Sequence, residues 1–203
     1  MMNVIYLGMV SFFADISAEM VYPLIPLYLT AAFGATPALV GVIEGIAESL
    51  ASLLKVFSGY VTDKYQRKKP IAFIGYSTGL IYKAALILAG SWMGILGARV
   101  IDRIGKGIRT APRDVMVSES AEQGQIGKAF GIHKALDMAG SAIGILMAYF
   151  MIRGTDGLLS YKKIFLISAI PILLAMAMFP LIRERKGDRC LKTRESFWRN
   201  INK

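Results

Sequence analysis

Acidic side chains occur in pairs, one helical turn apart, inside apolar stretches of this sequence. Asp15 and Glu19 form one pair, and Glu44 and Glu48 repeat the same i,i+4 spacing. An ionisable side chain near the centre of a bilayer costs at least ~2.5–3.5 kcal/mol, so such residues mark functional sites. Carboxylates in this position can bind a cation or carry a proton. We expect Asp15 and Glu19 to lie near mid-membrane and to act there.

A basic ladder follows further along the chain, in the segment GARVIDRIGKGIRTAPRD, residues 97–114. The ladder recurs there every three or four residues along one face of a helix and consists of Arg99, Asp102 or Arg103, Lys106, Arg109 and Arg113. We expect Arg103 to approach the Asp15/Glu19 pair and to govern when it is protonated. Arg109, nearer the cytoplasmic end, can alternatively extend to the membrane interface.

Another apolar stretch contains His133 and Asp137, again with i,i+4 spacing. Asp137 is a further candidate for the substrate or proton pathway. For His133 a structural hydrogen bond is a better explanation than a proton relay. Lys83, in a different apolar stretch, is expected to extend to the interface or to pair with an acid rather than to bind a ligand.

The composition indicates a membrane protein. Of 203 residues, 55% are hydrophobic and 19% are charged, and the mean hydropathy is +0.50. Soluble domains average roughly 45–50% apolar and 25% charged residues. The net charge of +10 does not indicate nucleic-acid binding, because the basic residues gather in one connecting segment and the C-terminal tail.

The apolar stretches predict an all-α protein with six transmembrane helices in residues 1–184 and a basic cytoplasmic tail in residues 185–203. Pro23 and Pro26 are expected to kink the first span, and Pro112 is expected to end the fourth. The expected spans are about 4–32, 38–62, 71–88, 92–111, 126–152 and 161–182.

Lysine and arginine counts set the expected orientation. Placing both termini inside puts fourteen basic residues in the inner connections and tail and three in the outer connections (Arg153, Lys162 and Lys163). The positive-inside rule therefore predicts cytoplasmic termini in a multi-pass protein of the plasma or inner membrane. The first apolar stretch is interpreted as a membrane helix rather than a signal peptide, because it has no basic n-region.

The segment GYVTDKYQRKKP, residues 59–70, joins the second and third spans. Its Gly-x-x-x-Asp-Lys-x-x-Arg-Lys spacing resembles the corresponding loop of the major facilitator superfamily of transporters, with Gln66 where that family usually has glycine. The match comprises Gly59, Asp63, Lys64, Arg67 and Lys68.

The ladder adds to this resemblance. Arg103, Gly107 and Ala111 match a fourth-helix motif of the superfamily, while Lys106 and Arg109 depart from it. The string DRIGKGIRTAPRD is similar to a poorly characterised prokaryotic branch.

The resemblance implies one six-helix half of a twelve-helix fold, with the cavity lined mainly by the first and fourth helices. The implied function is secondary active transport of a small solute by alternating access, as symport or antiport. We expect proton coupling and a homodimer or complementary half as partner. In this arrangement Glu44 and Glu48 are reserve proton carriers that face the partner, and Asp63 is a conformational latch. The alternative is a truncated or regulatory half that does not transport but binds a partner.

Two small-residue patterns are compatible with close helix packing, Gly41/Gly45 and Gly140/Gly144. They can face the partner half or pack within the six-helix unit. The sequence contains no Gly-rich phosphate loop and no Cys/His cluster, and it has the single Cys190. It therefore predicts no cofactor, metal or ATP drive, and an enzyme is the weaker interpretation.

Overall fold

The computed structural model describes residues 1–65, 67–122, 124–153 and 157–184, with side chains in the same ranges except 61–65 and 158. The predicted tail from residue 185 onward, including Cys190, lies outside these ranges. The described chain is helical and contains no strand. Its elements are α1 (Met2–Glu19), α2 (Leu24–Phe33), α3 (Pro37–Tyr65), α4 (Lys68–Leu88), α5 (Trp92–Ser120), α6 (Ile126–Arg153), α7 (Leu158–Ile167), α8 (Ala169–Met178) and the 3-10 helix η1 (Phe179–Leu181).

These elements form six long helical segments, of which the first (α1–α2) and the last (α7–α8–η1) are interrupted. Within the described ranges, four segments are long and apolar enough to cross a membrane: Met2–Phe33, Lys68–Leu88, Ile126–Arg153 and Leu159–Leu181. The other two have lower hydropathy, because α3 contains Glu44 and Glu48 and α5 contains the basic ladder. Large apolar side chains such as Val56 and Leu88 are 75% and 82% exposed, as expected of a lipid-facing surface.

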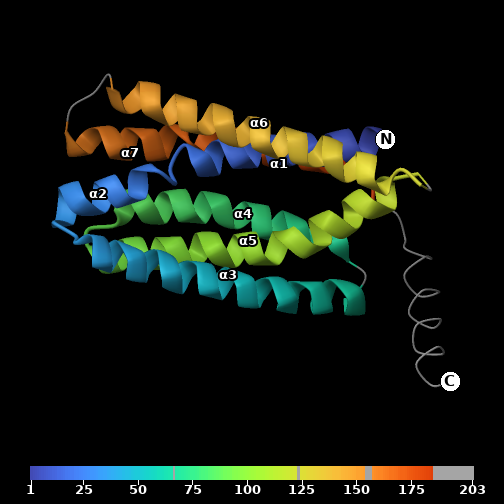
Figure 1. Cartoon of the computed structure of the whole chain (residues 1–203), viewed down its shortest axis with the longest axis horizontal. Coiled ribbons are helices and arrows are strands. Elements are labelled where there is room, and N and C mark those ends of the chain that lie inside the picture. Colours follow the sequence, from blue (N-terminus) through green and yellow to red (C-terminus); the bar gives the residue numbers. More distant parts are fainter. Residues whose placement is uncertain (66, 123, 154–156, 185–203) are drawn as a thin grey trace.

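The six segments run up and down in one bundle (Figure 1). The N-terminus and the C-terminal ends of α3 and α5 lie at one end of this bundle, and the C-terminal ends of α2, α4 and α6 lie at the other. Helix α5 packs against both α3 and α4, while α1 packs against α6 and α8. This arrangement places the acidic helix α1 and the basic helix α5 in the same bundle.

The first segment breaks at residues 20–23, just before Pro26 on α2. Val21 N–H bonds to Ala18 O at 3.1 Å instead of to Ser17 O, so the Ser17 carbonyl has lost its usual helical partner. The Lys83 ammonium donates to this oxygen at 2.8 Å. Lys83 is 3% exposed. It therefore does not extend to the interface or pair with an acid as expected, because the helix break offers a buried acceptor.

The expected end of the fourth span at Ala111 is wrong, because α5 continues through Pro112 to Ser120. A proline inside a helix leaves the carbonyl four residues earlier without its N–H donor. Here that carbonyl belongs to Ile108, and the Ser58 hydroxyl of α3 donates to it at 2.5 Å. A side chain from the neighbouring helix thus replaces the missing backbone bond and lets α5 continue.

The two glycine pairs differ in their surroundings. A Cβ added at Gly144 would lie 2.7 Å from Ile16 O, so this glycine lets α6 approach the backbone of α1, and Gly140 does the same at Phe12 O. A Cβ at Gly41 or Gly45 would meet nothing within 4 Å. The fifth-span pair therefore packs within the unit, and the second-span pair faces open space.

Candidate functional site

Arg99 is the most deeply buried charged side chain of the basic ladder, at 1% exposure. Its Nε donates to Glu44 Oε1 at 2.7 Å, and its Nη2 pairs with the other oxygen of the same carboxylate. Asp102, one turn further along α5, lies 3.3 Å from Nη1. Glu44 therefore faces α5 of its own unit, not a partner half as expected, because it neutralises the buried guanidinium.

Arg103 lies one turn beyond Arg99 and is also buried, at 4% exposure. Its Nε lies 3.3 Å from Glu48 Oε2, an ion pair without hydrogen-bond alignment, and Nη2 lies 3.9 Å from Glu44. The Tyr22 ring packs against both guanidinium groups, with its centroid 4.9 Å from Arg99 Cζ and 5.4 Å from Arg103 Cζ. Each of these two arginines thus has carboxylate and aromatic partners.

A cavity of about 310 Å³ opens between α1, α3 and α5 beside this network. Six of the sequence-predicted pathway residues line it, and Glu44 lies directly behind them on Arg99. The lining comprises Asp15, Ala18, Glu19, Tyr22, Glu48, Arg99, Asp102, Arg103, Lys106 and Arg109. Three helices that are apart in sequence therefore bring the acidic pair and the basic ladder to one place.

The charges in the cavity differ in whether they have partners. Within the described part of the chain, the side-chain charges of Asp15, Glu19 and Lys106 take part in no ion pair or hydrogen bond. Arg109 likewise has no carboxylate partner there, and its Cζ lies 4.7 Å from the Tyr76 ring centroid. The ion pair expected between Arg103 and the acidic pair of α1 is absent, because Arg103 pairs with Glu48 instead.

Asp137 belongs to a separate cluster and does not line this cavity. It is 3% exposed and lies 3.7 Å from Arg113, 3.7 Å from Lys134 and 3.8 Å from His133. His133 Nε2 hydrogen bonds with Ser11 Oγ at 3.1 Å, which agrees with the structural interpretation of this histidine. Ser11 is 1% exposed, so its hydroxyl is not presented to a substrate as a nucleophile would be.

Sequence reasoning placed Arg99 on the ladder but did not select it, Tyr22 or Asp102 as a pathway residue, although all three line the cavity. Their spacing was a usable signal, since Tyr22 follows Glu19 by one short turn and Arg99 precedes Arg103 by four residues. What the spacing does not indicate is which carboxylate pairs with which guanidinium.

The residues predicted as a latch lie at the end of the bundle that holds the α3–α4 connection. Lys68 is buried, pairs with Glu119 at the end of α5, and its backbone N–H bonds to Glu184 Oε1 at 2.7 Å. Arg67 precedes α4 and is exposed, and a Cβ at Gly59 would be 3.9 Å from Ala111. The side chains of Asp63 and Lys64 lie outside the described residues.

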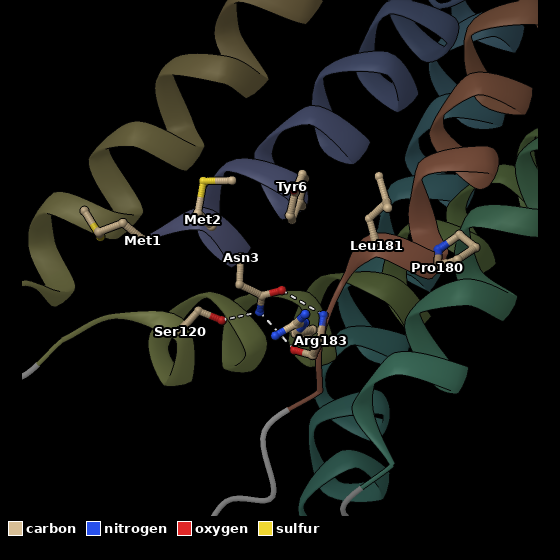
Figure 2. A pocket seen from close by; sticks show the side chains of 8 residues that line it. All are labelled: Met1, Met2, Asn3, Tyr6, Ser120, Pro180, Leu181 and Arg183. Atoms are coloured by element: carbon tan, nitrogen blue, oxygen red, sulfur yellow. Dashed lines mark hydrogen bonds between the residues drawn. The ribbon is translucent and has the colours of Figure 1, made fainter.

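A larger cavity, about 660 Å³, lies where the ends of α1, α5 and η1 meet, away from the charged network (Figure 2). Asn3 reaches across its edge, where it donates to Ser120 Oγ at 2.5 Å and to Arg183 O at 3.0 Å. Its Oδ1 accepts from Arg183 N at 2.8 Å. These bonds fasten the last described turn to α1 and α5, so the polar groups at the edge of this cavity have a structural role.

Comparison with known proteins matches residues 7–202 to the family described as Major Facilitator Superfamily. An uncharacterized MFS-type transporter of Methanocaldococcus jannaschii is 36% identical over 183 residues, which are 90% of this chain and 45% of that protein. An uncharacterized protein of Mycobacterium tuberculosis is 32% identical over 118 residues, 58% of this chain and 29% of that one.

Solved structures share the fold. A POT family transporter in complex with a thioalcohol-conjugated peptide matches with a TM-score of 0.79 at 16% identity, over 91% of this chain and 39% of that one. A mutant peptide transporter POT in complex with sulfate matches with a TM-score of 0.74 at 16% identity, over 98% of this chain and 43% of that one. This chain spans less than half the length of each of these proteins.

Proposed function

Since this chain belongs to the Major Facilitator Superfamily, we propose that it transports a small solute across the cell membrane by alternating access. The observation that carries the proposal is the cavity between α1, α3 and α5, in which Asp15 and Glu19 have no partner among the described side chains. Carboxylates inside a membrane helix are energetically costly, so they mark a binding or transport site by default. Peptide transport is not carried over from the structural neighbours, since 16% identity supports the fold alone.

The functional unit is proposed to contain a second six-helix half, either another copy of this chain or a complementary half. Glu48 has 61% of its side chain exposed, and Lys106 is also exposed, although both line the cavity. Charges in this position are costly against hydrocarbon, and a facing half would enclose them. The two halves would be related by an axis along the membrane normal, with the cavity between them.

Coupling to protons is proposed to run through the Asp15/Glu19 pair. The two carboxylates lie one turn apart, line the cavity and have no ion-pair partner among the described side chains. A substrate found by ligand screening allows a direct test, accumulation in proteoliposomes under an imposed pH gradient. The Asp15→Asn and Glu19→Gln variants are expected to lose the part of the substrate accumulation that the pH gradient drives. If both variants concentrate substrate as the wild type does, another group carries the proton.

Alternating access can be tested without knowing the substrate. In a Cys190→Ser background, Ala18→Cys places a thiol in the cavity lining, and Ala14→Cys places one on the same helix at a position that is 2% exposed. We expect impermeant thiol reagents to label position 18 from either side of the membrane in turn, and position 14 from neither. Labelling of position 18 from one side only would favour the alternative, a half that does not transport but binds a partner.

A further inference from the structure

The charges of the cavity fall into two classes, those paired with one another and those without an ion-pair partner among the described side chains. On the α3 and α5 side, Arg99 is neutralised by Glu44 and Asp102, and Arg103 is paired with Glu48. These groups sum to one net negative charge, which is held by carboxylates already paired with arginine. They build a rigid back wall, against which the Tyr22 ring packs.

Four charges remain available to a ligand. Asp15 and Glu19 contribute two carboxylates from α1, and Lys106 and Arg109 contribute two cations from α5. None of the four takes part in an ion pair with another described side chain, yet all line one cavity. These four charges are therefore balanced in number and carried by different helices, the negative ones by α1 and the positive ones by α5.

This separation discriminates between ligands by charge. An anion would gain contacts with Lys106 and Arg109 but would be repelled by Asp15 and Glu19, and a cation would meet the reverse situation. A molecule that carries both charges satisfies both walls at once, and each charge-assisted hydrogen bond is roughly twice as strong as a neutral one. A volume of about 310 Å³ is at the small end of ligand cavities.

We propose that the ligand of this cavity is a small zwitterion of amino-acid size. Its ammonium group binds Asp15 and Glu19 on α1, and its carboxylate binds Lys106 and Arg109 on α5. The inference rests on the proposed transport function, of which it names the substrate class. It does not depend on whether the second half is another copy or a complementary chain.

Matched ligands test the charge requirement on the purified protein in mild detergent. The panel contains L-alanine, L-leucine and 4-aminobutyrate, each beside its N-acetyl derivative, which is a monoanion, and its amide, which is a monocation. Binding is measured by calorimetry and by the rise in melting temperature. At least one zwitterion is expected to bind at least about tenfold more tightly than both of its derivatives, because each derivative leaves one pair of site charges unpaired. Equal binding of a derivative, or no binding by any zwitterion, overturns the proposal.

Two double variants then assign the walls. Asp15→Asn/Glu19→Gln removes the repulsion of anions, so the N-acetyl derivative should gain affinity while the zwitterion loses it. Lys106→Gln/Arg109→Gln should do the same for the amide. Lys163 is an exposed basic residue outside the cavity. Lys163→Gln is therefore the matched control and should change neither the affinity for the zwitterion nor the affinity for its derivatives. Loss of zwitterion binding without these gains overturns the assignment.

The labelling of Ala18→Cys from both sides needs no ligand, so the two proposals fail separately. Labelling in turn from both sides without a zwitterion preference would overturn the substrate class and leave transport standing. Labelling from one side only would overturn transport whatever the cavity binds.

Discussion

The ammonium group of Lys83 donates a hydrogen bond to the carbonyl oxygen of Ser17 at 2.8 Å, at the point where the first membrane segment breaks. The Ser17 hydroxyl in turn donates to Ser168 O at 2.6 Å, where α7 gives way to α8. Both Ser17 and Ser168 are buried. One lysine of α4 thus supports a contact between two interrupted helices that are about 150 residues apart in sequence.

Replacing Lys83 should destabilise the packing at the interruption between α1 and α2. Lys83→Met keeps most of the length of the side chain but removes the donor, so the buried Ser17 carbonyl loses a partner at a cost of about 1–3 kcal/mol. We expect a lower melting temperature in mild detergent. Lys163→Met, which changes an exposed lysine, is the control and should melt as the wild type does. Equal melting of both variants would show that the hydrogen bond contributes nothing.

The bond from Ser58 to Ile108 predicts coupling between Ser58 and Pro112. In the wild type, Ser58→Ala leaves the Ile108 carbonyl without a donor and should cost about 1–2 kcal/mol. In a Pro112→Ala background the new N–H of residue 112 can bond to this carbonyl, so the same serine change should cost much less. A double-mutant cycle of unfolding free energies isolates this difference from the other contacts of Ser58. Strictly additive costs would contradict the explanation.

The extent of α4 and α6 was close to predictable from sequence, because each is an apolar run bounded by charges or glycine. The extent of α5 was not, because the serine that lets it pass Pro112 comes from another helix. The same limit applies to the site. Spacing places the ladder on one face of α5. Only the packing of α3 against α5 determines that Arg99 pairs with Glu44, while Lys106 has no ion-pair partner among the described side chains.

The close approach of α1 and α6 predicts a position-specific effect of alanine. At Gly144 a new Cβ would lie 2.7 Å from the Ile16 carbonyl oxygen, which belongs to the backbone and cannot swing away. Gly144→Ala should therefore destabilise the protein by about 1–3 kcal/mol. Gly131→Ala, on the same helix with open space around it, should be neutral or slightly stabilising because alanine favours helix. Thermal unfolding of the two variants checks this, and equal stability would refute the close contact.

The expected orientation can be tested at two exposed connections. Gly90 joins α4 to α5, and Glu122 follows α5 at the opposite end of the bundle (Figure 1). With cytoplasmic termini, a cysteine at position 90 should react with an impermeant maleimide on intact cells, and one at position 122 should react only after permeabilisation. Cys190→Ser removes the native thiol. The reverse pattern would invert the topology and would set aside the basic-residue count on which it rests.

The open glycines of α3 predict where a second half binds. Gly140 and Gly144 are already used against α1, whereas a Cβ at Gly41 or Gly45 meets nothing within 4 Å. Their neighbours Val42 and Ile46 are 56% and 50% exposed, so this face offers apolar area and room for a close helix approach.

Gly41→Leu/Gly45→Leu should therefore block dimer formation while leaving the unfolding free energy of a monomer unchanged or raised, since leucine favours helix over glycine. Gly127→Leu/Gly131→Leu makes the same change on α6, also in open space, and should leave the dimer intact. Native mass spectrometry in mild detergent measures both variants. A wild type that is monomeric at every concentration would contradict the homodimer and leave a complementary half as the partner. A dimer that survives the α3 change would place the interface on another helix.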